Sequence, residues 1–167
     1  MTALLAPSKE NTLYEVEGGF LCNGSSQHFF AGKSASRPVR RAVAAFDLAG
    51  DVPVGSTITE VTLTLNMSRT VDDGQVTALH CMLADWGQSA SDHPSNEEAK
   101  VAATTVDATW IFRVFGSDPP SEYGGDFASA PIGNILVVGP GRYAWGSTAE
   151  TVDDVQMRVN SPAANFW

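Results

Sequence analysis

The chain has 167 residues, of which 43% are hydrophobic and 17% are charged, so it is long and apolar enough to fold around a packed core. Its formal net charge is −9 and its sequence pI is about 4.6, which argues against nucleic acid or an anionic membrane as the partner. The longest apolar runs span only a few residues, so the sequence predicts no transmembrane helix and no membrane insertion.

The beginning of the chain is rich in turn residues. Residues 1–10 are expected to form an N-terminal extension, and the first predicted strand spans residues 11–16 (NTLYEV). A Gly-rich loop is expected over residues 17–26. The aromatic pair in QHFFAG then predicts a short second strand over residues 27–32.

The most regular pattern lies in residues 39–67. Residues 61–67 (VTLTLNM) alternate between apolar and polar side chains, which predicts a strand with one apolar face. Residues 39–48 are apolar on both faces, so we expect a central strand that is covered on both sides. The segment between them, AGDVPVGST, has the composition of a turn.

The second half of the chain is less regular. Residues 76–83 are expected to return antiparallel to the preceding strand, because Asp-Asp-Gly at 72–74 signals a tight turn. Residues 84–105 are polar and small and predict a long surface loop. Gly-Pro-Gly separates residues 134–138 from residues 142–145, and this arrangement predicts a late hairpin.

One helix is predicted near the C-terminus. Ser147 and Glu150 match a capping box, and three valines follow at helical spacing: Val152, Val155 and Val159. The Asn-Ser-Pro sequence at 160–162 ends the predicted helix. Together, about eight or nine short strands and one short helix predict an all-β, jelly-roll-like β-sandwich that forms a single domain over residues 11–167.

The sequence contains no motif that indicates catalysis. The three histidines (His28, His80 and His93) are not at metal-ligand spacing, and no nucleophile elbow, P-loop or dinucleotide-binding motif is present. We therefore expect a protein that is not an enzyme and has no catalytic or cofactor-binding residue.

Two kinds of binding site remain as weak candidates. Asp118, Glu122 and Asp126 lie in a Pro/Gly-rich loop and are candidate ligands for structural Ca²⁺, although their spacing is not that of an EF-hand. Trp86 and Tyr123 lie beside irregular loops and are candidate contacts for a polysaccharide, because an exposed aromatic ring can stack on a sugar.

The cysteines and the basic residues do not by themselves indicate a function. Cys22 and Cys81 are either two buried thiols or one disulfide. The basic residues of the 37–41 cluster are expected to be solvated charges at the start of a strand.

Several segments together resemble one bacterial family, the DNRLRE-type, disaggregatase-related β-sandwich modules of secreted and cell-surface proteins. The resemblance is collinear from about Asn11 to Phe166 and rests on NTLYE, FFAG, RRAVAAFDL, VPVGSTITEVTLTLNMSRT, VTALHCMLADWGQS, VDATW, YGGDF, GRYAW and VDDVQMRVNSPAANF. It implies a jelly-roll-like sandwich that is usually exported and has no catalytic residues of its own. Some similar modules resemble carbohydrate-binding modules.

The chain departs from this family in two respects. The positions of Cys22 and Cys81 are usually not cysteine in such modules, and two unusual cysteines together favour a disulfide between them. The family pattern also continues after an NFGW-like segment, whereas this sequence stops at Trp167. A sandwich without its final strands exposes sheet edges, so we expect either that the sequence is incomplete or that another chain supplies the missing pairing, as strand donation between identical subunits does.

These observations favour a non-catalytic structural protein that assembles with copies of itself on a cell surface, in an extracellular filament or on a virion. The alternative is a glycan-binding or adhesive module of a secreted or cell-surface protein. Both imply an extracellular or surface location, although the first residues (MTALLAPSKEN) do not read as a signal peptide.

Overall fold

The structure is a computed structural model of the whole chain, and it describes residues 1–33, 38–70, 74–91, 100–164 and 166. The chain forms two compact units, each assembled from separate segments. We call Leu4–Asp47 with Met82–Asp126 and residues 166–167 the loop-rich unit, and we call Met1–Ala3 with Leu48–Cys81 and Phe127–Asn165 the helical unit.

The loop-rich unit contains two small antiparallel sheets. Strand β1 (Pro7–Tyr14) pairs with β3 (Arg40–Phe46), and the short strand β2 (Leu21–Cys22) pairs with β6 (Val101–Ala102). The last four residues of β1 are buried, so this strand is enclosed on both faces. In the described part of the chain β1 is the only strand that forms a ladder with β3, whose other edge has just an isolated bridge from Arg40 to Gly32, so the prediction that it is a central strand is wrong.

The core of the loop-rich unit joins these strands to the segment that follows residue 81. Its buried members are Leu13, Val43, Ala45, Trp86, Ala108 and Trp110. Trp86 is only 3% exposed, although it belongs to a segment predicted as a surface loop. The prediction fails at Trp86 because the residues around it in the sequence are polar and therefore predict an exposed segment, although this one large side chain is buried on folding.

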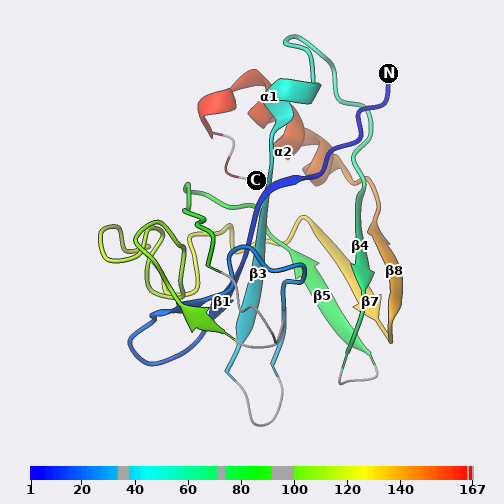
Figure 1. Ribbon diagram of the computed structural model, residues 1–167. Coiled ribbons are helices and arrows are strands. Elements are labelled where there is room, and N and C mark those ends of the chain that lie inside the picture. The colour runs from blue at the N-terminus through cyan, green and yellow to red at the C-terminus, as the bar shows by residue number, and fades with distance from the viewer. Residues whose placement is uncertain (34–37, 71–73, 92–99, 165, 167) are drawn as a thin grey trace. The chain divides into compact units, whose positions relative to one another are not determined.

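The helical unit contains two further two-stranded antiparallel sheets. Strand β4 (Leu63–Met67) pairs with β8 (Gly141–Trp145), and β5 (Gln75–Leu79) pairs with β7 (Gly133–Val137), so that each pair lies side by side (Figure 1). The short helix α1 (Leu48–Asp51), which falls in a predicted turn, lies against the C-terminal helix of the same unit. Antiparallel sheets and a C-terminal helix are thus confirmed.

Both predicted hairpins are wrong in their pairing, although their strands exist. Strand β5 does not pair with β4, nor does β7 pair with β8. The Tyr143 hydroxyl explains the second case, because it accepts hydrogen bonds from the backbone amides of Val138 and Gly139, at 3.1 Å each, and donates to the Gly139 carbonyl at 2.9 Å. These groups are therefore held in a corner that leads from β7 to β8, in place of a tight hairpin turn.

Two other predictions near the N-terminus need correction. Strand β1 begins at Pro7, within the predicted extension. No strand forms over residues 27–31, and only Gly32 makes an isolated bridge, to Arg40. The backbone amide of Phe30 instead donates to the Thr12 hydroxyl at 3.0 Å, so this segment is held by a side chain and not by a strand ladder.

The predicted C-terminal helix is confirmed as α2 (Ala149–Asn160), but its cap differs. The N-cap is Thr148, whose hydroxyl accepts from the Thr151 amide at 3.2 Å, while the Thr151 hydroxyl accepts from the Thr148 amide at 2.9 Å. Ser147, the predicted cap, accepts instead from the Val61 amide at 3.1 Å. The true capping box therefore lies one residue further along the chain.

Helix α2 is anchored by one apolar side chain and one ion pair. Val159 is buried, whereas Val152 and Val155 are half-buried. Arg158 is 2% exposed and its guanidinium contacts the Asp154 carboxylate one turn earlier, at 2.8 and 3.2 Å. A 3₁₀ turn, η1 (Pro162–Ala164), follows the helix. Among the described residues, no helix has the length and the apolar character that a membrane span requires.

Candidate functional site

The outward face of the β5–β7 strand pair carries large apolar side chains that are exposed. Val76 of β5 is 68% exposed and lies directly opposite Leu136 of β7, which is 55% exposed. Val138, just after β7, is 57% exposed, and a Cβ placed on Gly74 would lie 3.8 Å from Leu136 and 3.9 Å from Val138. These side chains form one contiguous patch, which we call the β5–β7 face.

The opposite face of the same strand pair is covered. Val137 is 4% exposed, and the indole nitrogen of Trp145 donates to the Thr77 carbonyl at 3.4 Å. Side chains alternate between the two faces of a strand, so covering Thr77 and Val137 directs Val76 and Leu136 to solvent. The exposure of the β5–β7 face therefore follows from the register of the strands and is not a local irregularity.

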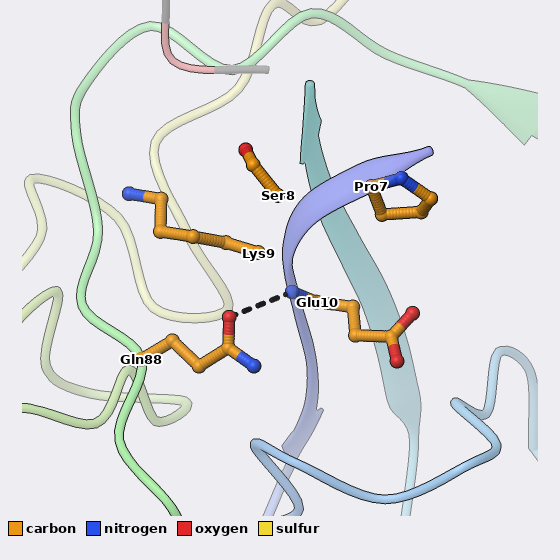
Figure 2. Close-up of a pocket in the computed structure, with 5 residues that line it drawn as sticks. All are labelled: Pro7, Ser8, Lys9, Glu10 and Gln88. Carbon is orange, nitrogen blue, oxygen red and sulfur yellow. Dashed lines mark hydrogen bonds between the residues drawn. The ribbon is translucent and has the colours of Figure 1, made fainter. Parts of the chain in front are cut away.

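A second candidate is a polar depression at the start of β1, with a volume of about 190 Å³. It lies where the register of β1 shifts between Pro7 and Lys9. Figure 2 shows the Gln88 side chain reaching the backbone nitrogen of Glu10, at 3.0 Å, while the Glu10 carboxylate points away from Gln88. The Ser8 hydroxyl donates to a backbone carbonyl of β3 at 3.1 Å.

The only cation of this depression is already engaged. The Lys9 ammonium lies 2.7 Å from the Asp85 carboxylate, donates to the Trp86 carbonyl at 2.6 Å and stands 4.7 Å from the centre of the Trp86 ring. Through these contacts with Asp85 and Trp86, Lys9 fixes the Trp86 segment to β1.

A buried carboxylate organises the other side of the loop-rich unit. Asp107 is fully buried and accepts from the Ser89 amide at 2.8 Å, from the Thr104 amide at 2.8 Å and from the Thr104 hydroxyl at 2.9 Å. A Cβ on Gly24 would lie 3.0 Å from both the Asp107 carboxylate and the Ser91 hydroxyl, so a larger residue there would press against both groups. These contacts are structural, and sequence reasoning did not single out Asp107.

Both cysteines are free, buried thiols, one in each unit. The Cys22 sulfur lies 3.2 Å from the Ser91 hydroxyl, and burial raises the pKa of Cys22 to about 12. Burial, together with the Asp154 carboxylate, raises the pKa of Cys81 to about 11. The structure does not contain the predicted disulfide between Cys22 and Cys81, and intact mass measurement with and without reductant would test whether it forms.

The calcium candidates are arranged around an arginine. Asp118 contacts Arg113 at 2.9 Å, and the nearly buried Asp126 lies 3.5 Å from the Arg113 guanidinium and accepts from the Ser121 amide at 2.7 Å. Glu122 contributes its backbone amide to Asp126, at 3.3 Å. Among the described residues no three acidic, histidine or cysteine side chains form a metal-binding group. Arg113 supplies the positive charge in this loop.

Of the two glycan candidates, only Tyr123 is accessible. Its side chain is 68% exposed, whereas Trp86 is buried and its indole nitrogen donates to the Phe166 carbonyl at 3.2 Å. Trp86 is therefore a core residue and cannot stack on a sugar.

The prediction that the basic residues of the 37–41 cluster are solvated charges is wrong for Arg40 and Arg41. Arg40 stacks over the rings of Tyr14 and Phe30, at 5.9 and 5.4 Å. Arg41 stacks over Trp110 at 4.7 Å and donates to the Gly124 carbonyl at 2.9 Å, and burial lowers its pKa. Both are packing residues, while residue 37 lies outside the described residues.

The described histidines show no catalytic arrangement. His80 bonds through its ring to the Ala128 carbonyl at 2.8 Å and packs edge-on against Phe127, and His28 lies on the surface. His93 lies outside the described residues.

Comparison with known proteins finds no family model, no curated protein and no solved structure that matches this chain. The resemblance to DNRLRE-type modules therefore rests on the sequence motifs alone.

Proposed function

We propose that this protein is a non-catalytic structural protein that assembles with copies of itself outside the cell: on a cell surface, in a filament or on a virion. The observation that carries this proposal is the β5–β7 face, where Val76, Leu136 and Val138 are each more than half exposed. Contiguous exposed apolar patches on soluble proteins mark sites of interaction.

The strand edges and the engaged polar groups support the same proposal. Each described sheet has only two strands, and a strand edge without a ladder partner is a surface on which another chain can pair, although Gln88 and Gly32 already occupy part of the outer edges of β1 and β3. Three charged side chains of the loop-rich unit, Asp107, Arg113 and Lys9, form contacts within that unit.

For the fold we propose a jelly-roll-like β-sandwich of the DNRLRE type. The antiparallel pairing of all four strand pairs is compatible with such a sandwich, as is the corner at Tyr143 between β7 and β8. The order of the sandwich strands and the role of a second copy in completing it are part of this proposal.

The proposal is tested by the mass of the purified protein in solution. We expect light scattering after size-exclusion chromatography to show species larger than one chain as concentration rises, and electron microscopy to show whether they form filaments. A monomer at every concentration that can be reached would contradict the proposal.

A second candidate function is glycan binding, and the exposed ring of Tyr123 favours it. A glycan array probed with the wild-type protein and with Tyr123→Ala tests this alternative. Phe20→Ala is a matched control, since Phe20 is a 49% exposed aromatic residue of the same unit. Binding that is lost only in Tyr123→Ala supports the alternative, and binding that is absent or unchanged contradicts it.

A further inference from the structure

We propose that the guanidinium of Arg40 is a binding site for a carboxylate group that a ligand supplies. The site lies in the loop-rich unit, away from the β5–β7 face of the other unit, so it is a binding function beyond assembly. Three observations carry the inference. The positive charge has no anionic partner among the described residues, the backbone on both sides fixes its position, and part of the side chain can be reached from solvent.

Arg40 is a cation that the described part of the chain does not compensate. Lys9, Arg113 and Arg158 each lie 2.7 to 2.9 Å from a carboxylate, whereas Arg40 forms neither an ion pair nor a side-chain hydrogen bond with the described residues. Residues 34–37, outside the described residues, are Ser-Ala-Ser-Arg and add no carboxylate. The Nε of Arg40 is buried without an acceptor, so water does not compensate that side of the charge. An anion at the guanidinium would therefore be attracted more strongly than at an exposed arginine.

The backbone on both edges of β3 fixes the position of Arg40. On one edge, Tyr14 of β1 lies directly opposite Arg40 in the strand register. On the other edge, the Arg40 amide donates to the Gly32 carbonyl at 2.9 Å and the Gly32 amide donates to the Arg40 carbonyl at 3.0 Å. Phe30, two residues before Gly32, is held by the bond from its amide to the Thr12 hydroxyl. The two rings beside the guanidinium are thus already in place, so a ligand would not have to order them.

The contacts of Arg40 favour a carboxylate over other anions. The guanidinium lies over the Tyr14 and Phe30 rings, at 5.9 and 5.4 Å from their centres, and a stacked guanidinium keeps the N–H groups at its edge for hydrogen bonds. A carboxylate is planar and accepts two parallel bonds from such an edge. Because the protein carries −9, it also repels a singly charged carboxylate less than doubly charged sulfate. Arg40 is half-buried, so part of its side chain is open to a ligand.

NMR titration of the full chain with sodium acetate tests the inference, with sodium chloride keeping the ionic strength constant. The buried Nε–H of Arg40 should give a resolved signal, which Arg40→Lys identifies by its loss. We expect this signal to shift and saturate with acetate, with a dissociation constant on the order of 1 mM, and to shift much less with sulfate. Sodium glucuronate distinguishes the two sources of a carboxylate: tighter binding than acetate would identify an acidic sugar, and equal binding would identify the carboxylate alone.

Three variants decide whether the guanidinium itself holds the anion. Arg40→Lys keeps the charge but removes the planar fork, so acetate binding, followed by the Gly32 and Phe30 amide signals, should weaken about tenfold or more. Phe30→Leu removes one ring and should weaken binding a few-fold. Arg142→Gln is the matched control, because Arg142 is an exposed arginine of the other unit, and it should leave binding unchanged.

The same titrations also state what would contradict the site. Signals that do not saturate with acetate or glucuronate, that respond equally to sulfate, or that respond equally in Arg40→Lys overturn the inference, and the proposed assembly is untouched by that result. Circular dichroism of each variant confirms that lost binding is not lost folding.

Discussion

Asp107 shows how one side chain can organise a segment that has little regular structure. Its buried carboxylate accepts three hydrogen bonds from Ser89 and Thr104, and so connects two parts of the chain that lie outside the strands. Removing the acceptor would leave three partly buried donors without this partner.

We therefore expect Asp107→Ala to lower the free energy of unfolding by about 3 kcal/mol or more, as measured by urea denaturation. Asp107→Asn keeps the shape but offers one acceptor oxygen, so it should be destabilising to a smaller extent. Asp153→Ala, at an exposed position of α2, is the control and should change stability by less than about 0.5 kcal/mol. Equal effects at the two aspartates would show that Asp107 has no special structural role.

The two cysteines should react slowly with alkylating reagents in the folded protein. With a pKa of about 12, roughly one Cys22 thiol in 10⁴ is ionised at pH 8, against about a tenth of thiols with the ordinary value of 9.0. Cys81, with a pKa of about 11, should also react slowly. Mass spectrometry after iodoacetamide treatment should show no labelling in buffer and two labels in urea. Rapid labelling of the folded protein would contradict the burial of the thiols, and no labelling in urea without reductant would reveal a disulfide.

The raised pKa of Cys22 also predicts how stability depends on pH. The unfolded chain loses the thiol proton near the ordinary value of 9.0, and the folded chain retains it up to about 12. The contribution of this group to stability is therefore fully present below pH 9 and is lost as pH rises from about 9 to about 12. Urea midpoints of the wild type should fall over this range more steeply than those of Cys22→Ser, and parallel curves would contradict the prediction.

At the scale of elements, the N-cap that forms in helix α2 is Thr148, whereas the sequence suggests Ser147. The Thr148 hydroxyl accepts from the Thr151 amide and also donates to the Ile132 carbonyl at 3.2 Å, whereas the Ser147 hydroxyl accepts one bond, from the Val61 amide outside the helix. We expect Thr148→Ala to destabilise the protein by about 1–2 kcal/mol and Ser147→Ala to cost less than about 1 kcal/mol. Urea denaturation of the two variants measures this order, and the reverse order would favour Ser147 as the cap.

Local patterns in the sequence were enough to locate most elements but not to pair them. The alternation in residues 61–67 marks β4 correctly, because it reflects one covered face and needs no knowledge of a partner. The partner of β4 is β8, which lies far along the chain, where Leu63 faces Trp145 and Leu65 faces Tyr143. Such aromatic and aliphatic cross-strand pairs decide the pairing, and a turn signal next to a strand does not reveal them.

At the scale of the whole molecule, the β5–β7 face could not be predicted from the sequence, because its exposure also depends on which strands pair. Val76 and Leu136 look like ordinary core residues of two strands. Only when β5 pairs with β7, and Trp145 and Val137 lie on the covered side, does the other side become an exposed apolar face. Of the earlier candidates, Tyr123 is exposed as expected, while Trp86 is not, because exposure depends on packing that no single segment determines.

The net charge of −9 makes a prediction that belongs to the molecule and not to any residue. If copies associate through an uncharged face, the main electrostatic effect on association is repulsion between two like-charged bodies, which dissolved salt screens. Raising sodium chloride from about 0.02 M, where the Debye length is roughly 20 Å, to about 0.3 M should therefore strengthen this association by about fivefold or more.

Sedimentation equilibrium at each salt concentration measures this change, and lowering the pH toward the pI of about 4.6 provides an independent check, since it removes charge without adding salt. Sodium chloride is preferred to sulfate because sulfate strengthens apolar burial by itself. Both treatments should act in the same direction if repulsion is the opposing force. Association that weakens as salt is added would instead mean that ion pairs hold the copies together, and the uncharged β5–β7 face would then not be the contact.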